Sequence, residues 1–369
     1  MRLIGRRFAL ATIATFSISA ATLAGEPPDN ADVDFSGLTI ELIVPYNAGG
    51  GSSLHAQVVA MLIRDQLRGR PSIVTRNVGG AGSVRGLNRF AREAKPDGRM
   101  IAALGTASYF AYLFGSPLVE YPLDRLIPIL SSPSGVIAYG RRDYGLTGDP
   151  VRDVLHLQAH APMHAGDDPA SGDLPVMYCY DLLQIHPRAV WGVSRGEARQ
   201  AFLRNEAQVN HDSLPVWQSD VEPLFRSGEL VPLFTLGFRD LSGRIGPDPN
   251  WPDVPSCPML YELVNGKPLE GVEREIYDML HALRMLVAKS IVLPPETPPA
   301  ILRSYQQAIE RALNRPELLS PAAQRELGGY PQLTGGAALE AHRTALAISP
   351  EARDYLLEWL ERTWGGRPW

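Results

Sequence analysis

Three apolar runs in the first 105 residues are each followed by a loop of small residues and then by apolar residues at helical spacing. The runs at 38–44, 72–75 and 100–104 are the expected strands, because each is short and is followed by turn-forming residues. Repeated strand, loop and helix predict an α/β fold with a parallel sheet and right-handed crossovers. Ligands of such sheets bind beyond the carboxyl ends of the strands, where all three loops fall.

The pattern weakens in the middle of the chain and returns later. Residues 145–173 hold three Pro and three His, and we expect them to form a loop-rich segment. The remaining expected elements are strands at 189–192, 230–236 and 284–292, a helix at 197–204, and C-terminal helices with apolar faces over 301–313 and 352–360.

Length and charge narrow the class of protein. A chain of 369 residues is too long for one typical core and suits two lobes of roughly 100–200 residues each. The composition, with 45% hydrophobic and 20% charged residues, is that of a folded domain. The net charge is only −5 and no basic stripe is present, so no nucleic-acid partner is expected.

The N-terminus has the layout of a secretory signal peptide. Arg2, Arg6 and Arg7 precede an uncharged run over 8–24, which ends in small residues before Gly25. A membrane anchor is the alternative, but the run is shorter than the roughly 20 residues that span a bilayer. We therefore predict a signal peptide at 1–24, a linker at 25–35 and a periplasmic protein, with the export route left open.

Cys179 and Cys257 are the two cysteines of the chain. An oxidising compartment permits a disulfide, but sequence alone does not show whether their Cα atoms approach closely enough. Two separate buried cysteines are the simpler interpretation, and pairing stays open.

The first loop, residues 45–53, contains three consecutive Gly before the expected helix. The unpaired N–H groups and the positive dipole end of a helix N-terminus bind anions such as carboxylates. No Gly-Lys-Ser/Thr follows, so the loop is not a P-loop. A simple tight turn is the alternative.

The second loop, residues 77–86, resembles a dinucleotide-binding fingerprint only loosely. Two Gly-rich helix starts on adjacent strands instead favour two halves of one anion site.

Residues 192–196 fit the G-x-S-x-G pattern of a hydrolase nucleophile, with Ser194 at its centre. Acidic residues and His281 follow in the chain order of such enzymes, which makes a secreted α/β hydrolase or esterase the alternative function. The N-terminal half has no HGGG-type oxyanion motif, so we predict no enzyme. A ligand-contacting turn is the competing interpretation of this segment.

His156, His160 and His164 recur at every fourth residue, with Asp167 and Asp168 nearby. On one helix these side chains could bind a metal. Ala161-Pro162 interrupts a helix there, so we predict a surface loop, no metal and no cofactor.

An ordered set of short motifs resembles the solute-binding proteins of tripartite tricarboxylate transporters. The likeness covers roughly residues 38–140 and 189–360 and is poor over 141–175. The motifs lie at 38–51, 77–86, 94–98, 104–106, 252–256 and 292–298.

The resemblance implies a Venus-flytrap fold, with two α/β lobes that each have a mostly parallel sheet flanked by helices. It implies a periplasmic, monomeric receptor that delivers a small organic acid to the permease subunits of a membrane transporter. We expect lobe 1 to comprise 36–137 and 237–369, and lobe 2 to comprise 138–236. A structural or signalling protein that binds another protein stays open as a third class.

The same resemblance implies which residues contact the ligand. They are Tyr46, Ala48, Gly49, Gly50, Ser52, Ser53, Gly80, Ala81, Gly82, Ser83, Thr106, Ala107, Ser108, Ser194, Arg195, Asp212 and Ser213. Many relatives carry Asp where this chain has Ser53, and that Asp can hold a ligand amine. The substitution predicts an acid without an amine. The second-lobe helix start of the family is unrecognisable at 173–178, so ligand identity does not transfer.

Overall fold

The computed structural model describes residues 33–240, 243–315 and 319–365. The predicted signal peptide (1–24) and most of the predicted linker (25–35) lie outside this part of the chain. Within it, no helix combines the length and the apolar character needed to cross a membrane.

A five-stranded sheet contains the three strands predicted from the N-terminal repeat. Its strands, in spatial order, are β2 (Ser72–Asn77), β1 (Thr39–Val44), β3 (Met100–Gly105), β12 (Lys289–Leu293) and β4 (Ile127–Ser132). β1 pairs in parallel with β2 and β3, which confirms the predicted parallel arrangement, whereas β12 runs antiparallel to β3 and β4. The strand predicted at 284–292 was placed too early: its first residues end helix α10 (Gly271–Met285).

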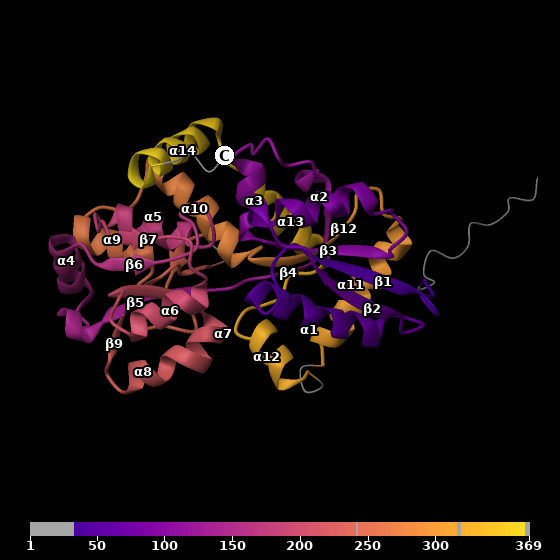
Figure 1. Cartoon of the computed structure of the whole chain (residues 1–369), viewed down its shortest axis with the longest axis horizontal. Helices are drawn as coiled ribbons and strands as arrows, with labels where there is room; N and C mark the ends of the chain where they lie inside the picture. Colours follow the sequence, from indigo (N-terminus) through magenta and orange to yellow (C-terminus); the bar gives the residue numbers. More distant parts are fainter. Residues whose placement is uncertain (1–32, 241–242, 316–318, 366–369) are drawn as a thin grey trace, which may run out of the picture. The chain divides into compact units, whose positions relative to one another are not determined.

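Helices cover both faces of this sheet because β1 is apolar on both. Leu42 and Val44 pack in a cluster with residues of α1 (Gly51–Gln66) and α11 (Pro299–Leu313). Ile43 packs with residues of α2 (Val84–Glu93), α3 (Thr106–Leu113) and α13 (Gly335–Leu346) in another. Figure 1 shows α1 and α11 on one side of the sheet and α2, α3 and α13 on the other. Such two-faced burial is typical of parallel strands.

The second sheet has three strands, in the order β8 (Val209–Ser213), β5 (Val136–Arg141) and β9 (Leu230–Thr235). β5 runs antiparallel to both neighbours. The expectation of a mostly parallel sheet in the second lobe is therefore wrong for this sheet. Apolar periodicity reports burial and leaves strand direction undetermined. Two smaller pairs accompany it: β6 (Met163–Ala165) with β7 (Arg188–Val190), parallel, and β10 (Phe238–Arg239) with β11 (Ile245–Gly246), antiparallel.

The segment expected to be loop-rich contains helix α4 (Pro150–His160) and strand β6. Asp149 caps α4 by accepting a hydrogen bond from the Arg152 N–H. Pro150 occupies the first helical position, where a missing N–H costs nothing. The prolines thus flank the helix instead of preventing it. His156 and His160 lie on α4, whereas His164 lies on β6.

The remaining helices complete the chain. They are α5 (Leu174–Leu182), α6 (Arg195–Leu203), α7 (Leu214–Val216), α8 (Glu222–Arg226), α9 (Cys257–Asn265), α12 (Pro321–Leu327) and α14 (Pro350–Trp364). Short 3-10 turns lie at Ala81–Ser83, Leu123–Arg125 and Arg142–Tyr144, and a π-helical turn at Trp217–Val221.

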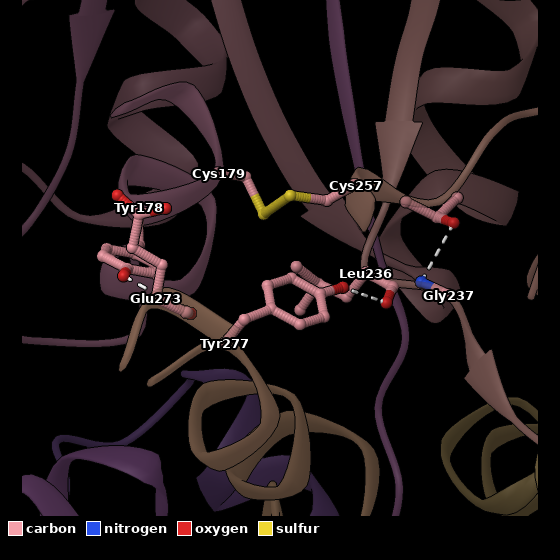
Figure 2. The surroundings of a disulfide bond; sticks show 8 residues. Tyr178, Cys179, Leu236, Gly237, Cys257, Glu273 and Tyr277 are labelled. Carbon is pink, nitrogen blue, oxygen red and sulfur yellow. Dashed lines mark hydrogen bonds between the residues drawn. A yellow bond between two sulfur atoms is a disulfide. The ribbon is translucent and has the colours of Figure 1, made fainter. Parts of the chain in front are cut away.

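Cys179 and Cys257 form a disulfide, with their Cα atoms 6.0 Å apart, so the preferred interpretation of two separate cysteines is wrong. Figure 2 shows the bond beside Tyr277, whose hydroxyl donates to the Leu236 carbonyl oxygen. The disulfide joins α5 to α9, and α9 also contacts α4 and β9. Residues near 257, assigned to lobe 1 from the sequence, therefore pack against elements assigned to lobe 2. The division into lobes stays a prediction.

Candidate functional site

The three small-residue loops meet at one edge of the five-stranded sheet. Tyr46, Ser83 and Ser108 each come from a different loop, and their hydroxyl groups form one network. Tyr46 Oη lies 2.9 Å from Ser108 Oγ, to which Ser83 Oγ donates a hydrogen bond at 3.0 Å. Burial raises the pKa of the Tyr46 phenol, so this hydroxyl keeps its proton. The loops predicted from the sequence are thus joined through side chains.

Gly105 makes room for this network. A Cβ atom at Gly105 would lie 2.5 Å from Tyr46 Oη and 3.0 Å from Tyr46 Cζ. The Gly105 backbone is extended, with φ −141°, so its conformation does not require glycine. Glycine is required at this position for lack of space, because the Tyr46 ring packs against it.

The first loop leads into α1 with its backbone exposed. Gly49 and Gly50 are exposed, as is Ala48, while Ser52 is half-buried. Gly50 is the N-cap residue, and the N–H groups of the first helical turn have no acceptor within the helix. Ser53 differs, because its side chain is fully buried and accepts a hydrogen bond from Asn77 Nδ2 at 3.0 Å. Its hydroxyl thus links the first loop to the end of β2.

The second loop has an unusual backbone. Four consecutive residues, Gly80, Ala81, Gly82 and Ser83, have positive φ angles of 127°, 49°, 57° and 85°. Positive φ is uncommon for residues other than Gly, and such strained backbone occurs mostly at ligand clamps and active sites. Gly80, Ala81 and Gly82 are exposed, so their peptide groups are accessible.

The third loop begins α3. Ser108 lies within the hydroxyl network, and Ala107 is half-buried. Thr106 is buried, and its Oγ1 has no hydrogen-bond partner among the described residues. Burying a hydroxyl without a partner is unfavourable.

Lys289 supplies a positive charge that sequence reasoning missed. It begins β12 opposite Gly105 and Ser132, and a Cβ at Gly51 would lie 3.9 Å from its Nζ. The ammonium group pairs with Glu326 at 2.7 Å. Assigning 284–292 to one strand gave no reason to place this side chain beside the first loop.

Ser194 is a helix cap. Its Oγ accepts a hydrogen bond from the Glu197 N–H at 3.3 Å, and Glu197 Oε2 accepts one from the Ser194 N–H at 2.7 Å. This reciprocal capping box holds the start of α6. The Ser194 φ of −64° lies in an unstrained region, unlike the strained turn of a nucleophile elbow. Among the described residues, no His or Asp is hydrogen-bonded to Ser194, so the geometry of a catalytic triad is not present.

Arg195 and Asp173 form a partly buried ion pair next to this cap. The Arg195 guanidinium donates to Asp173 Oδ1 at 2.9 Å, to Asn210 Oδ1 at 2.6 Å and to the His211 carbonyl oxygen. Burial alone would raise the pKa of Asp173. The charge of Arg195 and a hydrogen bond from His211 outweigh burial and hold that pKa well below its usual range.

Asp212 and Ser213 end β8, beside the start of β5. Asp212 is buried, accepts a hydrogen bond from the Tyr139 hydroxyl at 2.7 Å and pairs with Arg199 at 2.9 Å. Its carboxylate is therefore committed to protein partners. Ser213 is half-buried and precedes α7.

His164, Asp173 and His211 bring three potential metal ligands within 4.8 Å of one another. This set differs from the three histidines singled out in the sequence, since only His164 is common to both. Arg195 already donates to the same Asp173 oxygen, so a metal cation at this position would meet a positive charge. The arrangement favours a guanidinium over a metal at this carboxylate.

A surface pocket of about 480 Å³ lies elsewhere. It is lined by Arg244, Ile245, Gly246, Pro247, Pro258, Met259, Glu262, Pro268, Leu269 and Arg274. None of these residues belongs to the three loops. We place the polar ligand at the loops, because they carry the hydroxyl network and the exposed N–H groups.

Several solved structures have the same fold. The periplasmic binding protein BugD matches over 89% of this chain and 98% of its own, with 16% identity and a TM-score of 0.61. A TctC solute-binding protein from Polaromonas matches over 87% and 99%, with 17% identity and a TM-score of 0.60. The chain has the fold of a periplasmic binding protein. The predicted two-lobed α/β fold class is thereby confirmed.

Part of the chain is also similar in sequence to a protein of the same kind. Over 118 residues the chain is 30% identical to protein BugT of Bordetella pertussis, a match that covers 32% of this chain and 35% of BugT. The matched part is about a third of that relative's length. No protein-family model matches the chain. The resemblance predicted from the motifs is confirmed by the likeness to BugT in sequence and to BugD and TctC in fold.

Proposed function

We propose that this protein is an extracytoplasmic solute-binding protein that captures a small organic acid and delivers it to the permease subunits of a tripartite membrane transporter. In this proposal the protein is exported to the periplasm by its N-terminal signal peptide, acts as a monomer and catalyses no reaction on the solute. The binding proteins that share its fold are the first support for this role.

One observation carries the proposal: three loops at the carboxyl ends of β1, β2 and β3 converge on a single hydroxyl network. Their exposed backbone offers N–H donors from the starts of α1 and the Gly80–Gly82 turn. Lys289, which pairs with Glu326, places an ammonium group beside the first of these loops. The loops themselves contain no carboxylate, so their N–H donors suit an anion, since each charge-assisted hydrogen bond contributes about 1.5–3 kcal/mol.

Two proteins with this fold indicate the solute class. MatC from Rhodopseudomonas palustris was solved with bound malate and matches over 89% of this chain and 99% of its own, with 17% identity and a TM-score of 0.58. Another R. palustris protein, solved with adipate, has 15% identity and a TM-score of 0.58. Both solutes are dicarboxylates without an amine, as the residue at position 53 predicts for this chain.

The proposed contacts divide into two kinds. Backbone N–H groups of Gly50, Ser52 and Gly80–Gly82 bind the carboxylate, while Tyr46, Ser83 and Ser108 hold the loops in register. Ser53 acts indirectly, because its buried hydroxyl is bonded to Asn77. With Ser in place of Asp, this position offers no carboxylate to an ammonium group.

A thermal-shift screen of organic acids and amino acids, followed by calorimetry on the hits, tests the proposal. We expect amine-free dicarboxylates to bind at least ten-fold more tightly than glutamate or aspartate, which corresponds to about 1.4 kcal/mol. The same protein should show no hydrolysis of short acyl esters. Tighter binding of the amino acids would contradict the solute class, and ester hydrolysis that Ser194→Ala abolishes would contradict the binding role.

A further inference from the structure

Arg284 lies in the last turn of helix α10, close to the edge of the sheet where the loops converge. Its carbonyl oxygen accepts a hydrogen bond from the Ser134 N–H at 3.0 Å, just beyond β4. Two residues earlier in β4, Ser132 pairs with Lys289, which in turn pairs with Gly105 of the third loop. Arg284 is thus connected through main-chain pairing to the edge that carries the proposed anion site.

The Arg284 guanidinium has no partner in the described part of the chain. No hydrogen bond or ion pair joins it to a described residue, and its Nε is buried without an acceptor. The residue as a whole is partly exposed, so part of the side chain is accessible. A buried donor without a partner is unfavourable and calls for a specific reason.

The nearest charges do not neutralise Arg284. Asp173 and Arg195 are the groups that act on it most strongly after burial. Asp173 is already engaged by Arg195 at 2.9 Å and by His211 at 3.2 Å. One carboxylate thus interacts with two guanidinium groups, which leaves a positive charge in excess.

The neighbouring imidazoles do not change this balance. Burial lowers the pKa of His164 to about 3 and that of His211 to about 4, so both rings are neutral near pH 7. The Asp212 carboxylate is paired with Arg199. Asp167 is exposed, and its backbone N–H donates a hydrogen bond to Asp173 Oδ2 at 2.9 Å.

We infer that Arg284 and Arg195 form a second anion-binding subsite, which takes a second anionic group of the solute. The Arg284 guanidinium presents a planar set of N–H donors that fits a carboxylate or another oxyanion. The terminal N–H groups of Arg195 already donate to protein acceptors, so Arg195 contributes its positive charge. An anion there would supply the missing acceptor and cancel the excess charge. The inference rests on the proposed function, since the first carboxylate of the same solute would lie at the Gly-rich loops.

The test compares adipate with hexanoate, which has the same number of carbons and one carboxylate fewer. Calorimetry on the full mature chain should show adipate binding about 10- to 100-fold more tightly, the ratio expected from one charge-assisted contact. Arg284→Met should reduce that ratio to below about three-fold, and Arg284→Lys should retain part of it. Arg274→Met, on the same helix but paired with Asp278, is the control and should keep the wild-type ratio.

Stability without solute separates a binding role from a structural one. Met keeps the apolar stem of Arg and removes the unpaired charge, so the Tm of Arg284→Met should equal or exceed that of the wild type. A Tm clearly below the wild-type value would show that Arg284 is needed for folding, and it would overturn the inference. An unchanged adipate preference in Arg284→Met would overturn it as well, while leaving the proposed function standing.

A measurement with sulfate distinguishes failure of the subsite from failure of the proposed function. If no organic acid in the screen binds the wild type, the proposed function fails, and sulfate then tests the subsite alone. Sulfate should raise the Tm of the wild type more than that of Arg284→Met, relative to chloride at equal ionic strength. Equal gains in the two proteins would reflect general salt stabilisation and would refute the subsite.

Discussion

Replacing Gly105 by Ala should force Tyr46 out of its position and loosen the proposed site. The added Cβ would lie 2.5 Å from Tyr46 Oη, closer than carbon and oxygen atoms approach without displacement. Overpacking of a fitted interior typically costs about 1–3 kcal/mol. Loss of the bond between Tyr46 and Ser108 adds about 1 kcal/mol. We expect the free energy of unfolding to fall by about 2–4 kcal/mol in total.

The clash is mainly with the Tyr46 hydroxyl, which makes a double variant informative. Tyr46→Phe alone should cost about 1 kcal/mol through the lost hydrogen bond. In Gly105→Ala/Tyr46→Phe the nearest ring atom would lie 3.0 Å from the new Cβ, a contact that a small shift relieves. The double variant should therefore be more stable than the sum of the two single effects predicts, by about 1–2 kcal/mol.

Urea-induced unfolding of the four proteins measures this coupling. Gly336→Ala is the matched control, because a Cβ there meets no atom within 4 Å and the residue lies in α13. That control should be neutral or more stable by up to about 1 kcal/mol. A Gly105→Ala protein within about 0.5 kcal/mol of the wild type, or strictly additive effects in the double variant, would refute the proposed packing of Tyr46.

Four further changes have defined outcomes. Cys257→Ser opens a loop of 78 residues and should cost about 4 kcal/mol in urea unfolding, an effect that reductant on the wild type should reproduce. Asp173→Asn leaves the partly exposed Arg195 unpaired and should cost about 2 kcal/mol; no loss would contradict the ion pair. Burial lowers the pKa of His281 to about 4. Its contribution to stability is therefore full above about pH 6.5 and declines as the pH falls towards 4. His281→Gln should reduce the slope of unfolding free energy against pH in this range by up to about 1.4 kcal/mol per pH unit. Ser194→Ala removes a helix cap and should cost about 1 kcal/mol, measured by thermal unfolding.

The Gly-rich loops of the site could be predicted from the sequence because the patterns that mark them are local. Buried runs followed by small residues marked the strands at 39–44 and 100–105 and the loops after them. These features depend on periodicity and turn chemistry within a dozen residues. The hydroxyl network that joins the loops was not predictable, since Tyr46 and Ser108 are 62 residues apart.

The positions of Lys289, Arg284 and the disulfide depend on contacts between residues far apart in the sequence, which no local pattern indicates. The predicted strand at 284–292 contains both Arg284 and Lys289, and its pattern does not indicate that either side chain lies at the site. The disulfide between Cys179 and Cys257 spans 78 residues, and only the packing of α5 against α9 brings the sulfur atoms together. Helix α4 was missed because Pro150 was counted as a breaker although it stands at the first helical position.

A crystal structure of the mature protein with the best-binding dicarboxylate would show whether the three loops form the solute-binding site. We expect one carboxylate to bind the N–H groups at the start of α1 and those of the Gly80–Gly82 turn, within hydrogen-bond distance of about 3 Å. Lys289 should lie beside it. A solute bound elsewhere, such as in the pocket near Met259 and Leu269, with no solute at the loops, would refute the proposed site.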